Sequence, residues 1–377
     1  MPVPALRVFS ASWPGKIEPW RARFIRDLHV DLSKDFKTEV LAPAVHPEDP
    51  LEEEHDGLKL RRFRYRSGGK SPRQGGLGLL ESCSWILSAR KALKKWGGPA
   101  TKGVTLVHWG IPGAFLASSF CDPVTNPMVV WCHGSDVHRH GRKAIGAHLL
   151  RSGLRSAQRV LAASQEMADE LEKAHGIQGV EVLPVGIDDV FQMPAKVGRR
   201  NPGLKLLWVG ERLESKGYGR VLRGVQKAQD HGVPLTLDVI GEGPLTGTAD
   251  FVPNLHGARD SRGVCEAMDL ADLLLLPSHA EGTPLVIQEA KARSLPVAAT
   301  PVGGIPDLFE GDLGWFSLQS KEEDALESEI CDLLVQLDQS PELLQQKQQQ
   351  LRKSSIPVIY RKQSGERLAA ILQEVHP

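Results

Sequence analysis

The sequence predicts an α/β protein made of two doubly wound parallel-sheet domains. Three observations lead to this prediction. The chain has 377 residues, a length that suits two domains of ordinary size. Short apolar runs alternate with longer helical patterns, as in parallel sheets that are covered on both faces. The alternation restarts after a polar stretch with Pro and Gly at residues 192–203, which marks a linker.

The elements follow in chain order. The expected strands of the first domain are Arg7–Phe9, Glu39–Leu41, Thr105–Val107, Met128–Trp131, Arg159–Leu161 and Val180–Leu183, and those of the second are Leu204–Val209, Leu235–Ile240, Leu273–Leu276 and Pro296–Ala299. The expected helices include Ser164–His175, Tyr218–Asp230 and a Gln-rich stretch at Leu344–Leu351. The domains then span residues 1–195 and 200–352, with a last helix at about 355–377 packing back on the first domain. We expect them to face a cleft, with ligands beyond the carboxyl ends of the strands.

The composition excludes several classes of protein. Lys+Arg and Asp+Glu both number 46, so no overall charge favours nucleic acid. The longest apolar runs are too short to cross a bilayer, and the first residues do not resemble a secretion signal. The five cysteines are odd in number and lack C-x-x-C spacing, which argues against a disulfide scaffold or a zinc ribbon. We therefore expect a cytoplasmic protein.

The strongest local pattern follows the apolar run Leu273–Leu276. Thr283 suits a helix N-cap and Pro284 the first helical position. A helix should thus begin at a strand end, where the free amides of Leu285 and Val286 attract phosphate.

Two glutamates bracket this helix start. Glu281 lies in the loop before it, and Glu289 lies about a turn and a half inside it. One carboxylate can reach a ligand above the helix end, and the other a ligand lying along the helix. The alternative is that one glutamate complements the helix dipole and the other is solvated.

A second pattern lies at residues 208–217, again after a strand and before a helix. Gly210 permits a tight turn there. Arg212 and Lys216 can converge on one anion, the first as a planar fork and the second as a point charge. The alternative is a solvated basic pair.

Two further loops follow predicted strands. His133 comes directly after the run that ends at Cys132, where it faces the expected cleft or is satisfied by its own loop. Gly241–Pro244 lacks the third glycine of a dinucleotide-binding fingerprint, so we interpret it as a turn.

Taken together, these segments resemble the retaining GT-B glycosyltransferases of family 4, also called glycosyltransferase group 1, whose two domains are Rossmann-like. The spacing from Glu281 to Glu289 matches the family's E-x7-E motif, and Val209–Gly217 matches its V-G-x-R-L-x-x-K-G segment. The turn at Gly241–Pro244 and the run Ala299–Pro306 agree as well. In the first half, Val107–Trp109 and His133–Asp136 resemble the branch that builds bacterial surface polysaccharides.

The resemblance implies a role for each matched residue. Arg212 and Lys216 hold the diphosphate of a nucleotide sugar, and Glu289 binds the ribose hydroxyls. Glu281 contacts hydroxyls of the transferred sugar, which His133 reaches from the acceptor domain. The catalytic set is then His133, Arg212, Lys216 and Glu281, and the donor-binding set adds Gly15, Gly210, Gly282, Thr283, Pro284, Leu285 and Glu289, with a loop at Gly303 and Gly304 closing the nucleotide side. The chain departs from the family at Ala22, where relatives often have glycine.

The same resemblance implies the reaction and its partners. A hexose would pass with retention from a nucleotide donor, most simply UDP- or GDP-linked, to a glycan or a lipid-linked acceptor. No cofactor and no metal is expected, because the chain has no D-x-D after a strand, and Asp188 and Asp189 suit a turn. The alternatives are a GT-B sugar-nucleotide epimerase, which lacks E-x7-E, and a non-catalytic protein that binds a sugar nucleotide.

A basic stretch at Lys59–Lys102 holds twelve basic residues and one acid, directly after six acids in Glu48–Asp56. Basic residues beside Trp85 and Trp96 resemble a segment that lies on anionic lipid, which would make the protein peripheral on the inner face of the membrane. The equal alternative is a solvated loop and a helix packed on its own domain. Nucleic acid is not expected, because the stretch matches no nucleic-acid-binding module.

Overall fold

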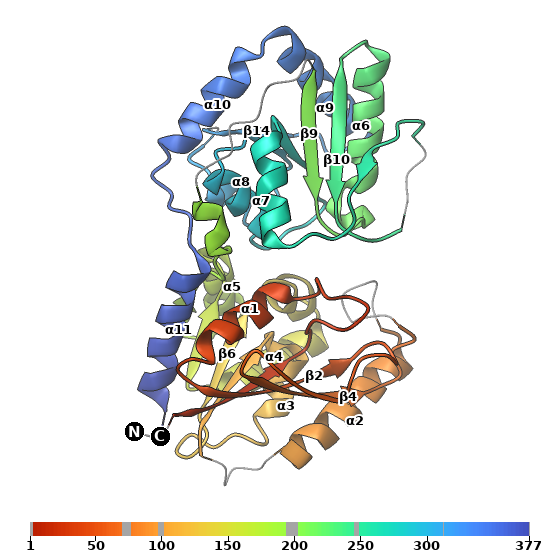
Figure 1. Ribbon diagram of the computed structural model, residues 1–377. Coiled ribbons are helices and arrows are strands. Elements are labelled where there is room, and N and C mark those ends of the chain that lie inside the picture. Colours follow the sequence, from red (N-terminus) through yellow and green to blue (C-terminus); the bar gives the residue numbers. More distant parts are fainter. Residues whose placement is uncertain are drawn as a thin grey trace. The chain divides into compact units, whose positions relative to one another are not determined.

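The computed structural model describes residues 3–69, 77–96, 102–193, 203–244, 249–311 and 313–376 (Figure 1). The chain divides into two compact units, which we call unit 1 (Met1–Val185 with Arg361–Pro377) and unit 2 (Gly186–Tyr360). Most of the linker predicted at 192–203 lies outside the described residues.

Unit 1 is built on an eight-stranded sheet within its described residues, in the order β3-β4-β2-β1-β5-β6-β7-β8. Every neighbouring pair is parallel except β3 with β4, which is antiparallel. The strands are β1 (Ala5–Ser10), β2 (Lys37–Ala44), β3 (Glu52–His55), β4 (Leu58–Arg64), β5 (Val104–His108), β6 (Met128–Cys132), β7 (Arg159–Ala162) and β8 (Glu181–Val182). The central strands β5 and β6 are buried throughout, as expected of a sheet with both faces covered.

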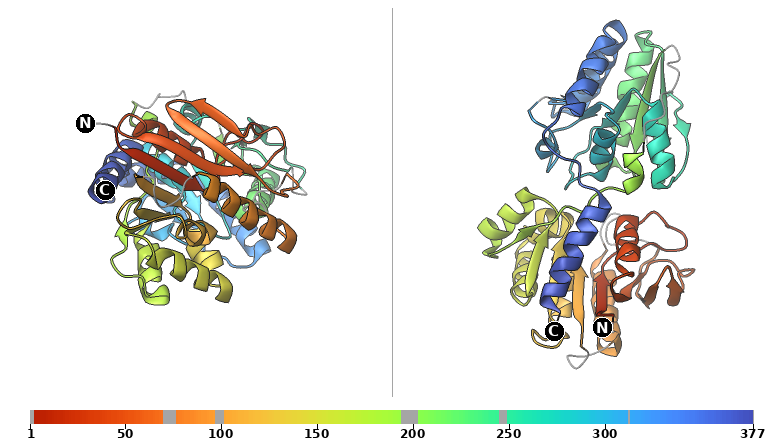
Figure 2. Two further views of the ribbon diagram at one scale, coloured as in Figure 1. Left: turned by 90° about the horizontal axis from the view of Figure 1, so that it is seen from below. Right: turned by 60° about the vertical axis from the view of Figure 1, so that its left-hand side comes forward.

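The helices of unit 1 are α1 (Arg23–Leu32), α2 (Leu79–Trp96), α3 (Phe115–Ala117), α4 (Ala144–Arg155), α5 (Gln165–His175) and α11 (Arg361–Val375), with short helical turns at Gly110–Ala114 and Ser135–Gly141. Local sequence sets the ends of α5: the Ser164 hydroxyl accepts the Met167 amide, and Gly176 closes the helix with φ 64°. Helix α11 packs against α1, with Arg361 donating to Asp31 at 2.9 Å (Figure 2).

The acidic and basic stretches meet in the strand pair β3–β4, which the sequence pattern did not predict. Glu52 lies opposite Arg61 and Glu54 opposite Lys59, so opposite charges pair across the two strands. Arg62 is buried and donates to Glu53 at 2.8 Å. The first part of the basic stretch is therefore a strand of the sheet rather than a solvated loop.

Unit 2 is built on a six-stranded parallel sheet within its described residues, in the order β11-β10-β9-β12-β13-β14. Its strands are β9 (Leu204–Val209), β10 (Leu235–Ile240), β11 (Asn254–Leu255), β12 (Leu273–Leu276), β13 (Val297–Ala299) and β14 (Trp315–Ser317). Its helices are α6 (Tyr218–Asp230), α7 (Ser261–Leu270), α8 (Leu285–Ala292), α9 (Glu323–Gln339) and α10 (Glu342–Arg352), with short turns at Asp189–Gln192, Glu214–Lys216 and Pro306–Leu308.

Alternation along β9 builds a core on each face of this sheet. Leu206 and Trp208 point into a core with residues of α6 and α9, whereas Leu207 lies in a second core with residues of α7 and α8. Parallel strands with helices on both faces confirm the predicted α/β class. No described helix is long and apolar enough to span a bilayer.

Candidate functional site

Four loops of unit 2 meet at one end of its sheet, because they follow the adjacent parallel strands β10, β9, β12 and β13. Two glycines with left-handed backbones let them touch. A Cβ at Gly217 (φ 71°) would lie 2.0 Å from the Pro277 carbonyl oxygen, and one at Gly303 (φ 56°) would lie 1.9 Å from that of Glu281. The Gly304 amide also donates to the Gly282 carbonyl at 2.9 Å.

The closest charged contact between these loops joins Lys216 and Glu281. The Lys216 ammonium donates to one Glu281 oxygen at 2.6 Å, and the Ser278 hydroxyl donates to the other at 2.7 Å. The Glu281 side chain is 6% exposed and that of Lys216 is 35% exposed. In this pair, the cation is therefore partly accessible to a ligand, whereas the carboxylate is nearly buried.

Arg212 takes a position that the sequence did not predict. Its guanidinium donates to the carbonyls of Gly241 at 2.7 Å and of Gly243 at 2.7 and 3.2 Å, and the residue is buried. The turn at Gly241–Gly243 therefore serves as a platform for Arg212. These bonds use three of the five guanidinium N–H groups, so the side chain keeps donors for an anion.

Glu289 lies inside α8, four residues after Leu285, the first residue of the helix. Burial, and secondly the carboxylate of Asp188, raise the pKa of Glu289 to about 7. A carboxyl group held in this way changes charge near neutral pH, which is common at functional sites.

The start of α8 differs from the prediction. The helix begins at Leu285, and Pro284 is its N-cap, with an extended backbone of φ −69° and ψ 120°. Because Pro284 is itself extended, it takes the cap position, and the expected cap Thr283 lies one residue before it. Its hydroxyl is buried without a hydrogen-bond partner among the described residues.

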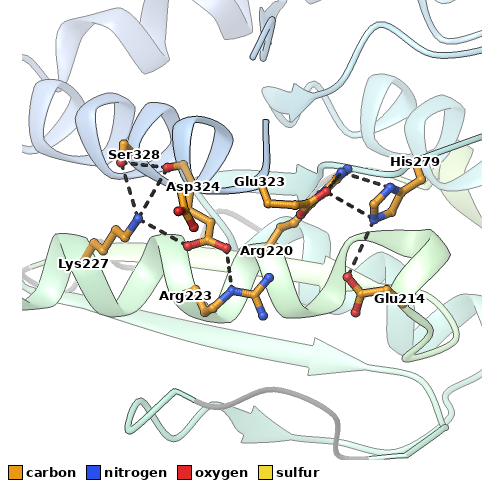
Figure 3. Close-up of polar contacts among 9 residues, drawn as sticks. Glu214, Arg220, Arg223, Lys227, His279, Glu323, Asp324 and Ser328 are labelled. Carbon is orange, nitrogen blue, oxygen red and sulfur yellow. Dashed lines mark hydrogen bonds and ion pairs between the residues drawn. The ribbon is translucent and has the colours of Figure 1, made fainter. Parts of the chain in front are cut away.

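Arg220, which sequence reasoning missed, supports the loop that carries Glu281 (Figure 3). From α6 it donates to the Pro277 carbonyl at 3.0 Å, to His279 Nδ1 at 3.0 Å and to both oxygens of Glu323. The signal in the sequence was an arginine on the face of α6 that buries Tyr218 and Val221.

Acidic groups near this arginine do not form a free ligand set. Atoms of Glu214, His279 and Glu323 lie within 4.8 Å of one another. Arg220 already donates to two of the three, so the cluster is an ion-pair network. Asp188 caps the short turn Asp189–Gln192 by accepting the Val190 amide at 2.9 Å.

His133 lies in unit 1, directly after β6. Its loop is fixed by Asp136, a buried carboxylate that accepts the amides of His133 at 3.2 Å, Gly134 at 2.9 Å and Gly110 at 2.7 Å. Asp136 thus ties the loops after β5 and β6 together, a role that the motif alone did not reveal.

Gly15 lies in the first loop of unit 1, where a Cβ would be 2.4 Å from an oxygen of Asp49. Ala22 opens α1 with a left-handed backbone of φ 48° and ψ 30°. This is the conformation that glycine adopts without strain, which explains why the family pattern has glycine there.

Two family models match the chain. The model described as glycosyltransferase family 4 matches residues 22–191, and the one described as glycosyl transferases group 1 matches residues 203–336. Together they span most of both units. The chain belongs to this glycosyltransferase family.

Named relatives agree with this membership. TuaC of Bacillus subtilis, a glycosyltransferase named for teichuronic acid biosynthesis, is 30% identical over 213 residues, which are 54% of this chain and 54% of TuaC. The amylovoran biosynthesis glycosyltransferase AmsK of Erwinia amylovora is 25% identical over 264 residues, which are 63% of this chain and 62% of AmsK. The chain therefore spans about half to two thirds of the length of these relatives.

Solved structures show the same fold. HepE of Anabaena, in complex with UDP-glucose, matches with a TM-score of 0.68 at 14% identity, covering 98% of this chain and 99% of HepE. The two units are thus the two parallel-sheet domains of a GT-B protein, as the sequence predicted.

Proposed function

We propose that this chain is a retaining, metal-independent glycosyltransferase. It moves a hexose from a UDP- or GDP-sugar to a glycan or a lipid-linked acceptor, in the synthesis of a surface polysaccharide or glycolipid. The names of TuaC and AmsK, both assigned to the synthesis of bacterial polysaccharides, support this choice of product.

The observation that carries the proposal is the pairing of Lys216 with Glu281 at 2.6 Å where the loops of unit 2 converge. A diphosphate gives Lys216 a second anionic partner beside Glu281, and the carboxylate keeps the ammonium in place before the donor arrives. Arg212, held by carbonyls, offers its remaining donors to the same phosphates.

The start of α8 supplies the uncharged part of the donor site. Its first amides, at Leu285 and Val286, belong to the turn whose N–H groups have no partner within a helix. The buried Thr283 hydroxyl next to them lacks a partner among the described residues, so a polar ligand there would satisfy it. Glu289 lies along the helix, where its carboxylate would accept ribose hydroxyls. HepE, which shares the fold, is solved with UDP-glucose.

Chemically, breaking the anomeric bond leaves negative charge on the departing diphosphate. Fixed cations at Arg212 and Lys216 stabilise that charge most in the transition state. The leaving phosphate oxygen then accepts the proton of the acceptor hydroxyl as the new bond forms on the same face of the sugar. This route retains the anomeric configuration, and it uses neither an opposite-face base nor a metal.

A thermal-shift screen against UDP-, GDP-, ADP- and dTDP-sugars tests the donor, because a ligand that binds the native state raises the melting temperature. We expect the sugars of one nucleotide base to raise the melting temperature most, and we expect this increase to be smaller in Lys216→Ala. The anomeric proton coupling of the product then tests retention: a β-linked product from an α-linked donor would refute it. Activity that needs Mg²⁺ or Mn²⁺ after chelation would refute metal independence.

Two readouts separate the alternatives. An epimerase changes the donor sugar without an acceptor and releases a new sugar nucleotide. A non-catalytic binder shows a thermal shift but no donor hydrolysis. The proposed transferase hydrolyses the donor slowly without acceptor.

We also propose that the protein contacts an anionic membrane through one face of α2. Trp85, Ala89 and Leu93 pack into unit 1, so the tryptophan expected at the lipid lies in the core. The opposite face exposes Leu79, Leu80 and Leu87 by 88%, 72% and 68%. It continues into the exposed residues Arg90, Lys91, Lys94 and Lys95.

An apolar patch followed by four cations suits a surface of anionic lipid. Sedimentation with vesicles of phosphatidylcholine and phosphatidylglycerol tests this contact against vesicles of phosphatidylcholine alone. Leu87→Gln should reduce binding, whereas Ile145→Gln, which changes an exposed residue of α4, should not. Equal binding to both vesicles, or by both variants, would contradict the contact.

A further inference from the structure

His279 connects the two loops that carry Lys216 and Glu281. Its backbone amide donates to the carbonyl of Ser215, the residue before Lys216, at 3.0 Å. It also directly follows Ser278, whose hydroxyl donates to one oxygen of Glu281 at 2.7 Å. The backbone of His279 therefore joins the neighbour of the cation to the residue that orients the carboxylate.

The side chain of His279 makes contacts on both sides of its ring (Figure 3). Arg220 of α6 donates to Nδ1 at 3.0 Å. On the other side, Nε2 lies 3.7 Å from an oxygen of Glu214 and 3.9 Å from an oxygen of Glu323. Glu214 begins the short turn that ends at Lys216. The ring thus also faces the loop of the cation.

The chemistry of these contacts places the proton of the ring. A guanidinium has N–H donors and no acceptor, so His279 Nδ1 must be the bare nitrogen that accepts from Arg220. The ring proton then lies on Nε2, which faces the carboxylates of Glu214 and Glu323. An N–H is attracted there, whereas a bare nitrogen would be repelled. Both sides of the ring therefore require the same arrangement.

Arg220 is held by more than its contact with His279. It is buried, and it donates to the Pro277 carbonyl at 3.0 Å and to both oxygens of Glu323, the first residue of α9. An arginine with these partners stays in place if the histidine ring is removed. The loop that carries His279 then loses its contact with a fixed donor.

We infer that His279 is a positioning residue of the donor site. Its ring, held by Arg220, keeps the loop of Glu281 against the loop of Lys216, so that the ammonium and the carboxylate stay 2.6 Å apart. A fixed cation is what a leaving diphosphate needs, because small displacements of such groups cost much of the rate. This inference rests on the proposed function where it concerns turnover; the contact between the loops does not depend on it.

Two substitutions of His279 test the role of its hydrogen bond. His279→Asn keeps an acceptor, because the amide oxygen can take the place of Nδ1, whereas His279→Leu removes it. Both variants keep the backbone amide that donates to Ser215. His231→Leu is the matched control, since His231 is an exposed histidine at the opposite end of α6 from Arg220.

Amide hydrogen exchange followed by NMR tests the contact without any measurement of activity. The amide at position 279 should exchange about tenfold faster in His279→Leu than in wild type, because loss of the ring contact lets the two loops separate more often. The rate should be close to wild type in His279→Asn and in His231→Leu. An unchanged rate in His279→Leu would overturn the inference.

Steady-state kinetics test the consequence for turnover. In His279→Leu, kcat should fall about tenfold and the donor KM should change by about twofold at most, because the displaced groups act mainly on the transition state. His279→Asn should recover most of kcat, and His231→Leu should keep all of it. A change in KM alone, equal losses in both variants of His279, or an unfolded His279→Leu would overturn the inference.

The two readouts separate this inference from the proposed function. Faster exchange in His279→Leu of a protein that transfers no sugar would refute the proposed function and leave the loop contact standing. Sugar transfer by wild type with an unchanged kcat in His279→Leu would refute the positioning role and leave the proposed function standing.

Discussion

The two units place their polar groups in opposite ways. In unit 2, Lys216 and Glu281 are charged, contact each other directly and lie partly at the surface. In unit 1, His29 and His108 are fully buried and neutral, with 2.8 Å between His29 Nε2 and His108 Nε2 and 2.8 Å between His108 Nδ1 and His133 Nε2, and the His108 ring also stacks on His133. Under the proposed function, the first arrangement suits a diphosphate that gains negative charge during the reaction, and the second suits an uncharged sugar hydroxyl.

The largest expected effect comes from breaking the charged pair. Lys216→Ala and Glu281→Gln should each lower kcat by about a thousandfold, because each removes a group aimed at the transition state. Circular dichroism should show an intact fold, since both residues lie in loops between strand and helix. Near-normal turnover in either variant would refute the assignment, and an unfolded variant would mean a structural role instead.

A large effect on stability is expected where the two loops of unit 1 are tied. Asp136→Ala removes the acceptor of three backbone amides, so it should lower the free energy of unfolding by about 3 kcal/mol. Asp136→Asn keeps one side-chain oxygen as an acceptor, so its free energy of unfolding should fall less than that of Asp136→Ala. Urea unfolding measures both, and equal losses would show that the number of accepted amides does not matter.

Glu289 gives an effect that depends on pH. Its pKa is raised in the folded protein to about 7 from an ordinary value of 4.5, so the folded state prefers the protonated form. Stability from this group is therefore present below pH 4.5 and lost as the pH rises through 7. Glu289→Gln, which cannot ionise, should be about 2 kcal/mol more stable than wild type at pH 8 and equal to it at pH 4.

Melting temperatures at the two pH values check this prediction, and a constant difference between them would contradict it. The same variant should bind the nucleotide donor less tightly. A stabilising change that weakens binding would identify Glu289 as a residue kept for function.

The smallest effect is expected at Ala22. Ala22→Gly should stabilise the fold by about 1 kcal/mol, because glycine adopts the left-handed conformation at φ 48° without steric cost. Gly217→Ala, at a similar positive φ but with the Pro277 carbonyl in the way, should instead destabilise. A destabilised Ala22→Gly would mean that the Ala22 methyl group contributes more by packing than its backbone costs.

Sequence patterns were sufficient to predict the strands that follow from mainly apolar runs. The strands Leu204–Val209, Leu235–Ile240 and Leu273–Leu276 have the predicted bounds, because most of their residues are apolar and lie in the buried sheet. The pair β3–β4 was missed because its residues are charged and stabilise each other only across the strands.

Some residues of the candidate site were likewise predicted from the sequence, and others were missed. Lys216 and Glu281 were found through local motifs, and the structure brings them together. Arg220 and His29 were missed because their partners, Pro277 and His108, are 57 and 79 residues away in the chain. One sequence cannot show contacts of that kind, since either residue alone resembles any other polar residue on a helix.

Helix α11 has a consequence for synthesis on the ribosome. It belongs to unit 1 and packs against α1, yet it is translated after the whole of unit 2. The apolar side of α1, with Leu28 close to Gly365 in the finished protein, must therefore wait uncovered while unit 2 emerges. Unit 2, whose residues are contiguous, can fold during translation, whereas unit 1 is complete only once α11 has been made.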